Sequence, residues 1–208
     1  MKTIPSKIIL AAGFVLALAF TFSCSSGDDT SGGGSCNMNG YKKVEMPDGK
    51  TWMAENLNCD VEGSVCYDPY CTQYGRLYNW EAAKKACSGG WHLPSNTEWE
   101  ALLTSVGGDS TAGKHLKARE GWIDCGPSGS GAENSCEDTY GFAALPGGFI
   151  DIIGLFWFDG EYSSWWSSSE YSAYNAYSWD ISNNWESVSG GDININKNYL
   201  FSVRCVQN

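Results

Sequence analysis

Cysteine is the residue type with the clearest chemistry in this chain, because nine of the 208 residues are cysteines. Cysteines at such density bind zinc in reducing compartments or form disulfides in oxidising ones. Cys66 and Cys71 lie close together, but the two histidines, His92 and His115, are not near any cysteine pair. Zinc sites normally show compact, paired spacings. We therefore expect no metal site, and we predict disulfides for the eight cysteines that follow Cys24.

Cys24 is set apart because it follows an apolar leader. Residues 8–22 carry no charge and are preceded by Lys2 and Lys7, which is the pattern of a secretory signal peptide. The apolar stretch is shorter than the roughly 20 residues that a membrane-spanning helix needs. We therefore predict that residues 1–23 are a signal peptide that is removed during export.

Two fates of the leader remain open. Lipid modification of Cys24 as the first mature residue leaves eight cysteines, an even number that can pair completely. Cleavage after the A-x-A pattern at residues 17–19 would instead give a secreted chain with a free thiol. Residues 24–35 are mostly Gly, Ser and Asp, so they are predicted to form a flexible linker with a mean span of roughly 18 Å. We favour a lipoprotein of the cell envelope, on the outer membrane or cell surface, with secretion as the alternative.

The charge of the chain is strongly acidic. It is −11 for the whole sequence, and loss of Lys2 and Lys7 with the leader takes it to −13. Such a surface repels phosphate backbones and anionic lipid headgroups. We therefore exclude nucleic acid as a partner and expect membrane contact through the lipid anchor alone. Residues 36–208 are enough for a single domain with its own core.

Two helices are predicted in this domain. The first begins after Asn79, a good N-cap, and covers residues 80–87 before a glycine pair. The second begins at Ser95, which forms a capping box with Glu98. Its apolar residues recur at helical spacing, as Trp99, Leu102, Leu103 and Val106. We therefore assign Trp99 to the core and Glu98 to the cap, and not to a carbohydrate-binding or catalytic pair.

Strands are predicted before and after the helices. Residues 41–44 and 51–53 flank a Pro-Asp-Gly turn. Apolar and polar residues alternate with period two at 177–181 and again at 201–205. Asn-, Ser- and Gly-rich segments between such runs are typical of hairpin turns. The order of elements predicts an α+β domain, with helices first and an antiparallel sheet after them.

Aromatic residues form the strongest candidate for a binding surface. They make up 14% of the chain and gather between residues 149 and 199. Exposed aromatic rings offer large amphipathic faces, and contact surfaces favour Tyr, Ser, Gly and Asn. A sheet also needs aromatic residues for its core, and we assign Trp165, Trp166 and Trp179 to that role. The predicted ligand face consists of the aromatic residues flanked by Ser, Asn and Glu: Tyr162, Tyr171, Tyr174 and Trp185.

No catalytic residue, metal or cofactor is expected. The motifs H-E-x-x-H and G-x-S-x-G and nucleotide-binding loops are absent from the sequence. Acid pairs such as 137–138 lie in loops with no apolar surroundings to raise a pKa. The oxygen-rich residues 180–186 could hold calcium, but a hairpin turn uses the same residue types. His92 is expected to pack or cap beside a helix, and His115 to lie in a solvated segment.

Six motifs, in order, resemble the Fibrobacter succinogenes major paralogous domain family over residues 41–207. They are T-W-M-A-E-N-L-N at 51–58, Y-G-R-L-Y-N-W at 74–80, W-H-L-P-S at 91–95, Y-G-F-A-A-L-P-G-G at 140–148, W-W-S-S-S-E at 165–170 and F-S-V-R-C-V at 201–206. That family resembles a branch of the C-type-lectin-like superfamily, which also includes the formylglycine-generating sulfatase modifiers. The resemblance implies a C-type-lectin-like fold, in which two helices pack on a twisted antiparallel sheet with long, disulfide-stapled loops. Members look like bacterial surface lipoproteins without a settled activity.

The resemblance also implies the disulfide pairing. It places Cys87 with Cys205, between the first helix and the last strand. Eight cysteines permit about 105 connectivities. The other pairs then follow by proximity, and the last by elimination: Cys66 with Cys71, Cys125 with Cys136, and Cys36 with Cys59.

The site chemistry of the relatives is not evident in the sequence. An enzyme of the formylglycine-generating type needs two neighbouring reactive cysteines, and no C-terminal pair has that spacing. The E-P-N, Q-P-D and W-N-D motifs of calcium-dependent lectins are also absent. We therefore expect a surface-anchored, non-catalytic binding or adhesion module for a glycan or another extracellular ligand. The alternatives are a divergent formylglycine-generating-type enzyme and a structural surface protein without a small ligand.

Overall fold

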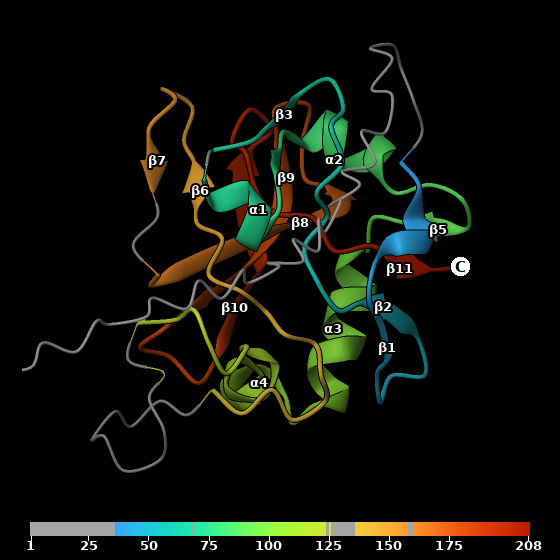
Figure 1. Cartoon of the computed structure of the whole chain (residues 1–208), viewed down its shortest axis with the longest axis vertical. Helices are drawn as coiled ribbons and strands as arrows, with labels where there is room; N and C mark the ends of the chain where they lie inside the picture. Colours follow the sequence, from blue (N-terminus) through green and yellow to red (C-terminus); the bar gives the residue numbers. More distant parts are fainter. Residues whose placement is uncertain (1–35, 68, 124, 126–135, 158–159) are drawn as a thin grey trace, which may run out of the picture. The chain divides into compact units, whose positions relative to one another are not determined.

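The two ends of the domain meet in one antiparallel sheet of the computed structural model (Figure 1). Its strands, in spatial order, are β1 (Lys43–Glu45), β2 (Thr51–Met53), β11 (Val206–Gln207) and β5 (Trp91–His92). Val206 pairs with Trp52 on one side and with His92 on the other. The two strands predicted around the Pro-Asp-Gly turn are therefore confirmed, since β1 and β2 pair with each other.

The structure describes residues 36–67, 69–123, 125, 136–157 and 160–208. The leader, Cys24 and the linker lie outside these residues. All elements named below belong to one compact unit, which spans residues 33–208. Among the described residues, no helix combines the length and the apolar character needed to cross a membrane.

A second antiparallel sheet contributes three tryptophans to the core. It consists of β8 (Tyr162–Glu170), β9 (Asn175–Ser182) and β10 (Val188–Asn196), with β9 in the centre. Trp165 lies opposite Trp179 in the register of β8 and β9, and both are buried in one apolar cluster. Trp166 is buried in a second cluster with Phe201 and Leu57. The assignment of the three tryptophans to the core is therefore confirmed.

Two short antiparallel pairs complete the strands of the described residues. β3 (Ser64–Val65) pairs with β4 (Leu77–Tyr78), and β6 (Phe149–Ile150) pairs with β7 (Phe156–Trp157). The described chain therefore forms several small antiparallel sheets, where the sequence led us to expect one.

Both predicted helices are present with their predicted caps. α2 (Trp80–Ala86) begins after Asn79, whose side chain accepts a hydrogen bond from the Ala82 backbone N–H. α3 (Asn96–Ser105) begins after Ser95, and both bonds of the capping box with Glu98 are formed. Trp99 is buried, so the assignment of Trp99 to the core and Glu98 to the cap is confirmed.

Two further α-helices show that the expectation of only two was wrong. α1 (Tyr70–Tyr74) has five residues, too few to show a helical repeat. α4 (Asp109–Leu116) contains Gly113, a poor helix former. A Cβ at Gly113 would lie 2.5 Å from the Ser187 carbonyl oxygen, so close packing on the β9–β10 turn requires this glycine. A short 3-10 helix, η1 (Met38–Gly40), precedes β1.

The strand predicted at residues 201–205 is also corrected. This stretch is extended but pairs only at isolated points, with Phe201 opposite Tyr78 and Ser202 opposite Trp165. Ser202 and Arg204, the polar residues of this alternation, are fully buried. The segment runs between two packed layers, so both of its faces are covered. The alternation of apolar and polar residues therefore does not separate a buried face from an exposed one.

Four disulfides staple the described chain. They join Cys36 to Cys59, Cys66 to Cys71, Cys87 to Cys205 and Cys125 to Cys136, which are the pairs expected above. The bond from Cys87 to Cys205 links the end of α2 to the residue before β11. It therefore fixes a helix to the sheet that holds both ends of the domain.

Candidate ligand-binding site

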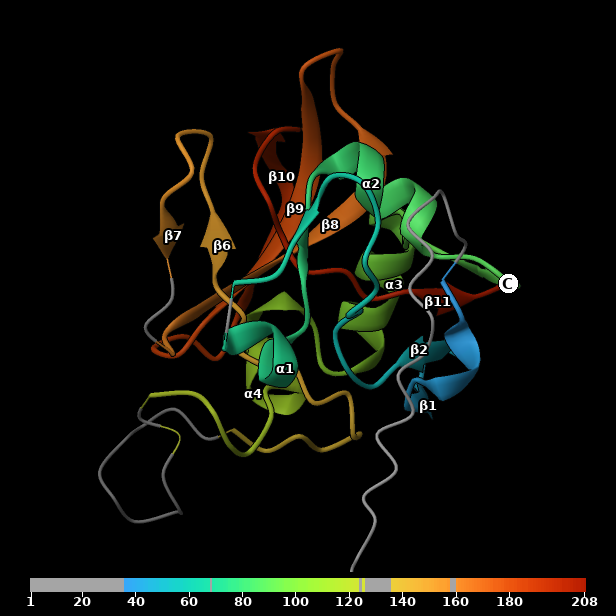
Figure 2. The ribbon, with the colours of Figure 1, turned by 45° about the horizontal axis from the view of Figure 1, so that its top comes forward.

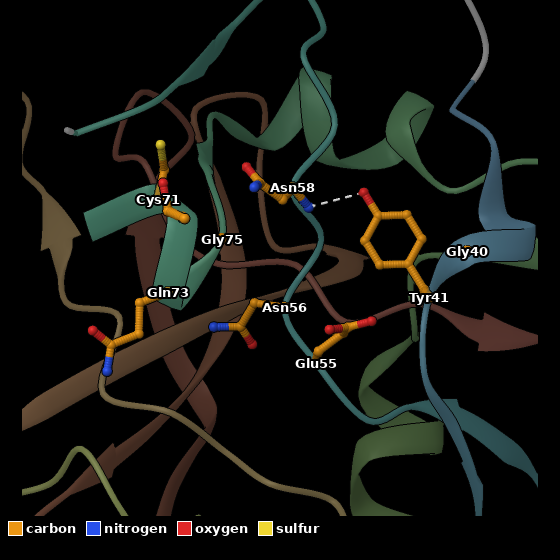
Figure 3. Close-up of a pocket in the computed structure, with 9 residues that line it drawn as sticks. Gly40, Tyr41, Glu55, Asn56, Asn58, Cys71, Gln73 and Gly75 are labelled. Carbon is orange, nitrogen blue, oxygen red and sulfur yellow. Dashed lines mark hydrogen bonds between the residues drawn. The ribbon is translucent and has the colours of Figure 1, made fainter. Parts of the chain in front are cut away.

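A polar cleft of about 380 Å³ opens beside α1. It is lined by residues of η1, of the segment after β2 and of α1 with its C-cap: Gly40, Tyr41, Glu55, Asn56, Asn58, Cys71, Thr72, Gln73 and Gly75. Figure 3 shows Tyr41 on one side and Gln73 on the other, with Glu55 and Asn56 between them. Segments distant in sequence therefore build this cleft together.

Asn56 fixes the base of the cleft because its amide is fully hydrogen-bonded. Its Nδ2 donates to the Tyr74 carbonyl oxygen at 2.9 Å and to Ser202 Oγ at 3.3 Å. Its Oδ1 accepts from Trp165 Nε1 at 2.9 Å and from Arg204 Nε at 2.7 Å. An asparagine amide offers two donors and two lone pairs, so none remains for a ligand. We therefore assign Asn56 a positioning role.

Tyr41 and Glu55 form the wall next to β1. The Tyr41 hydroxyl accepts a hydrogen bond from the Asn58 backbone N–H at 3.1 Å. Partial burial of the ring, with a contribution from the Glu55 carboxylate, raises the pKa of Tyr41, so the phenol stays neutral. One Glu55 oxygen accepts from the Lys42 backbone N–H at 2.7 Å. Both side chains are therefore held in place and remain partly exposed to the cleft.

The opposite wall is the C-terminal part of α1. Thr72 and Gln73 are exposed there, and the disulfide of Cys71 holds the helix. Gly75 ends α1 with φ of +83°, and a Cβ at this position would lie 2.8 Å from the Leu57 carbonyl oxygen. Close approach of the two walls therefore requires glycine at position 75.

The lining suits a neutral, hydroxyl-rich ligand. It contains no lysine or arginine, so it offers no cation to an anionic group. It does contain an aromatic ring, amides, a hydroxyl and one carboxylate, which can stack on a sugar face and exchange hydrogen bonds with its hydroxyls. Glycoside hydrolysis typically uses two carboxylates, and Glu55 is the single acid in the lining.

Arg204 forms a buried anchor beneath the cleft. Besides Asn56, its guanidinium donates to the carbonyl oxygens of Met53 at 3.0 Å, Ala143 at 2.6 Å and Phe142. Burial lowers the pKa of Arg204 to about 9. The motifs at 51–58, 140–148 and 201–206 therefore meet at one guanidinium, which gives a physical reason for their occurrence in one chain.

The family to which these motifs point is also found by comparison. The model of the Fibrobacter succinogenes major domain matches residues 48–207 of the chain. The chain belongs to this family. Comparisons with curated proteins and with solved structures found no match. The Asn56–Arg204 anchor lies inside the region matched to the Fibrobacter succinogenes major domain, whereas Gly40 and Tyr41 precede it.

In this Fibrobacter succinogenes major domain, the four aromatic residues predicted as a ligand face do not come together. Tyr171 and Tyr174 are exposed between β8 and β9, whereas Trp185 is exposed in the turn between β9 and β10. These positions are at opposite ends of β9, which is eight residues long and so spans roughly 25 Å. None of the four lines the cleft. The structure therefore does not gather the four residues into one face, and their role in ligand binding stays a prediction.

Tyr162 differs from the other three because it is half-buried. Its ring packs edge-on against Phe149, with 5.8 Å between ring centroids. Burial, followed by the charge of Asp180, raises the pKa of Tyr162. Asp180 is itself buried, and burial raises its pKa to about 6 although Ser164 and Tyr162 hydrogen-bond to it. Tyr162 therefore belongs to an internal polar group and offers little surface for stacking.

The oxygen-rich turn at 180–186, which was considered as a calcium loop, binds the side-chain ammonium of Lys117 instead. Lys117 is fully buried, and its Nζ donates to the carbonyl oxygens of Ser182 at 3.2 Å, Asn183 at 3.0 Å and Trp185 at 2.9 Å. Burial lowers the pKa of Lys117 to about 8, partly offset by Glu186. The ammonium takes the backbone oxygens that a metal ion would need. In the described part of the chain, no group of three or more His, Cys, Asp or Glu side chains could hold a metal ion.

The two histidines lie in different polar networks. His92 Nε2 is 2.8 Å from Glu98 Oε1, so His92 joins the cap of α3 as expected. Burial of Glu98 would raise its pKa, but hydrogen bonds from Ser95, His92 and Lys50 outweigh this and lower it to about 2. His115 lies in α4, half-buried, with Nδ1 3.0 Å from Thr139 Oγ1. The prediction that His115 lies in a solvated segment is therefore wrong.

Proposed function

We propose that the domain is a non-catalytic binding module that holds a neutral glycan in the cleft between Tyr41 and Gln73. The observation that carries the proposal is the composition of the lining. It offers the Tyr41 ring, the Glu55 carboxylate, the amides of Asn58 and Gln73 and the Thr72 hydroxyl, but no cation. The acidic net charge of the chain repels anionic ligands, so it also favours neutral ones.

The proposal includes a C-type-lectin-like architecture and attachment to the cell envelope. Support for the architecture comes from the sheet that joins both ends of the domain and from the disulfide between α2 and the segment before β11. Support for the location comes from the leader, the position of Cys24 and the Gly/Ser/Asp linker. An anchored module of this kind would present its cleft to glycans at the cell surface.

The main alternative is a divergent formylglycine-generating-type enzyme. That chemistry needs two neighbouring free thiols, whereas all eight cysteines among the described residues are paired in disulfides. The cleft contains one of them, Cys71, in its disulfide with Cys66. A structural surface protein without a small ligand is the other alternative.

A glycan array and a pulldown with insoluble polysaccharides test the proposal on the chain from residue 25 onward, which contains every described element. Saturable binding of neutral glycans without consumption of the ligand is the expected result. Turnover of a bound substrate would contradict the non-catalytic assignment, and absence of any glycan binding would favour a structural protein.

A further inference from the structure

The hairpin of β6 and β7 carries an exposed apolar tip, defined as residues 152, 153, 155 and 157. The side chains of Ile152, Ile153, Leu155 and Trp157 are 53–75% exposed. The two strands lie at the rim of the domain in both views of the ribbon (Figures 1 and 2). Four large apolar side chains within six residues on a projecting hairpin form a patch that water solvates poorly.

Asp151 gives this tip a fixed shape. One of its carboxylate oxygens accepts from the backbone N–H groups of Ile153 at 3.0 Å and Leu155 at 2.9 Å. The other accepts from Trp157 Nε1 at 2.9 Å. These hydrogen bonds, that of Trp157 first, lower the pKa of Asp151. The Asp151 carboxylate is therefore used internally, and it fixes the backbone of the loop that carries the apolar side chains.

Aromatic rings surround the base of the same hairpin. Phe156 stacks on Tyr67 with 3.9 Å between centroids and lies 5.7 Å from Tyr70. Trp157 stacks on Phe149 at 6.2 Å, and Tyr67 is exposed. Aliphatic residues therefore occupy the loop, and amphipathic aromatic residues lie behind them. Membrane-associated proteins show this order, with aliphatic side chains in the hydrocarbon and Trp or Tyr at the headgroup level.

We propose that the tip inserts into the surface of a neutral lipid bilayer and orients the domain on the membrane. Residues 120–196, which include the tip, contain no lysine or arginine, so this stretch of the chain offers no cation to an anionic headgroup. The tip is a projection and not a groove, which suits a deformable lipid surface better than a peptide. The linker predicted after Cys24 spans roughly 18 Å, which keeps the domain within reach of the membrane that would hold its anchor.

Vesicle flotation tests the proposal on the chain from residue 25 onward, which lacks the leader and Cys24. The probe is a vesicle of neutral phosphatidylcholine, alone or mixed with anionic phosphatidylglycerol. The variant Ile152→Ser/Ile153→Ser/Leu155→Ser removes the three aliphatic side chains of the tip but leaves Trp157, Asp151 and their hydrogen bonds. The control Tyr171→Ser/Tyr174→Ser removes two equally exposed rings from the β8–β9 hairpin.

The unchanged chain and the control are expected to float with neutral vesicles, and the tip variant to partition at least tenfold less. Near-ultraviolet circular dichroism should show that all three proteins are folded. No flotation of the unchanged chain, equal flotation of the tip variant, or binding that requires phosphatidylglycerol would each overturn the proposal. A dimer that the tip variant abolishes, without vesicle binding, would instead identify a second copy of the chain as the partner.

Discussion

Asn56 shows how one side chain can connect three distant parts of the chain. Its amide bonds to Tyr74, Ser202, Trp165 and Arg204, and all of these bonds are buried. Replacement of such a residue leaves its former partners buried without a hydrogen bond. This desolvation penalty lowers the free energy of unfolding more than the loss of the bonds themselves. Arg204 matters most, because it is charged and fully buried.

We therefore predict that Asn56→Ala lowers the free energy of unfolding by about 3 kcal/mol, because a charged donor and neutral partners are left unsatisfied. Asn58→Ala is the matched control, since Asn58 is exposed in the same motif and should change stability by less than about 0.5 kcal/mol. Urea denaturation measures both. Equal stability of the two variants would show that Asn56 is not the anchor.

Lys117 gives a prediction about pH. Burial lowers its pKa to about 8 in the folded chain, against an ordinary value of 10.5, so the unfolded chain binds this proton more tightly. Stability contributed through this group should therefore rise with pH between 8 and 10.5, as the folded ammonium loses its proton first. Denaturation curves of the unchanged chain and of Lys117→Met should diverge over this range. Parallel curves would refute the assigned pKa.

At the scale of elements, α3 is the helix whose sequence signals agree best with its structure. Ser95 and Glu98 form both bonds of the capping box, and the same glutamate binds His92 and Lys50. We predict that Ser95→Ala costs about 1 kcal/mol of stability. Thr97→Ala, an exposed change in the first turn, should cost much less in the same thermal denaturation experiment. A cost for Thr97→Ala as large as that for Ser95→Ala would contradict the capping role.

Elements with local signals could be predicted from the sequence, and those set by tertiary contacts could not. The N-cap signals of α2 and α3 each lie within four consecutive residues, so the sequence predicts both helices. α4 depends on the packing of Gly113 against Ser187, which no local pattern records. The burial of Ser202 depends in the same way on layers that cover both sides of its segment.

The candidate site could not be predicted from the sequence, because it too depends on tertiary contacts. Its walls come from η1 and α1, and the segment that carries Glu55 lies between them, so no periodicity in the sequence joins them. The motif at 51–58 contains no signal that Glu55 and Asn58 face an open cleft. Aromatic richness instead pointed to β8–β10, where exposed rings lie at both ends of β9 and do not converge.

At the scale of the whole molecule, the disulfide between Cys87 and Cys205 closes the longest loop, with a sequence separation of 118. Its replacement by alanines should cost about 5 kcal/mol by the chain-entropy model, because the unfolded chain gains freedom. Replacement of the pair Cys66 and Cys71, separated by 5 residues, should cost only about 2 kcal/mol. Denaturation of the two double variants makes the comparison. Equal losses would mean that loop length does not determine the contribution.

Binding of a neutral glycan in the cleft beside Tyr41 can be tested by filling the cleft with a bulky side chain. Gly40 lines it, and a Cβ at this position meets no atom within 4 Å, so Gly40→Trp can add a bulky side chain without backbone strain. Asn39→Trp adds the same group to η1 on an exposed residue outside the lining.

Calorimetric titration with a neutral oligosaccharide selected on the array is the measurement. We predict that Gly40→Trp weakens binding at least tenfold, while Asn39→Trp binds like the unchanged chain and both variants keep its thermal midpoint. Unchanged affinity in a folded Gly40→Trp variant would contradict the assignment of the cleft.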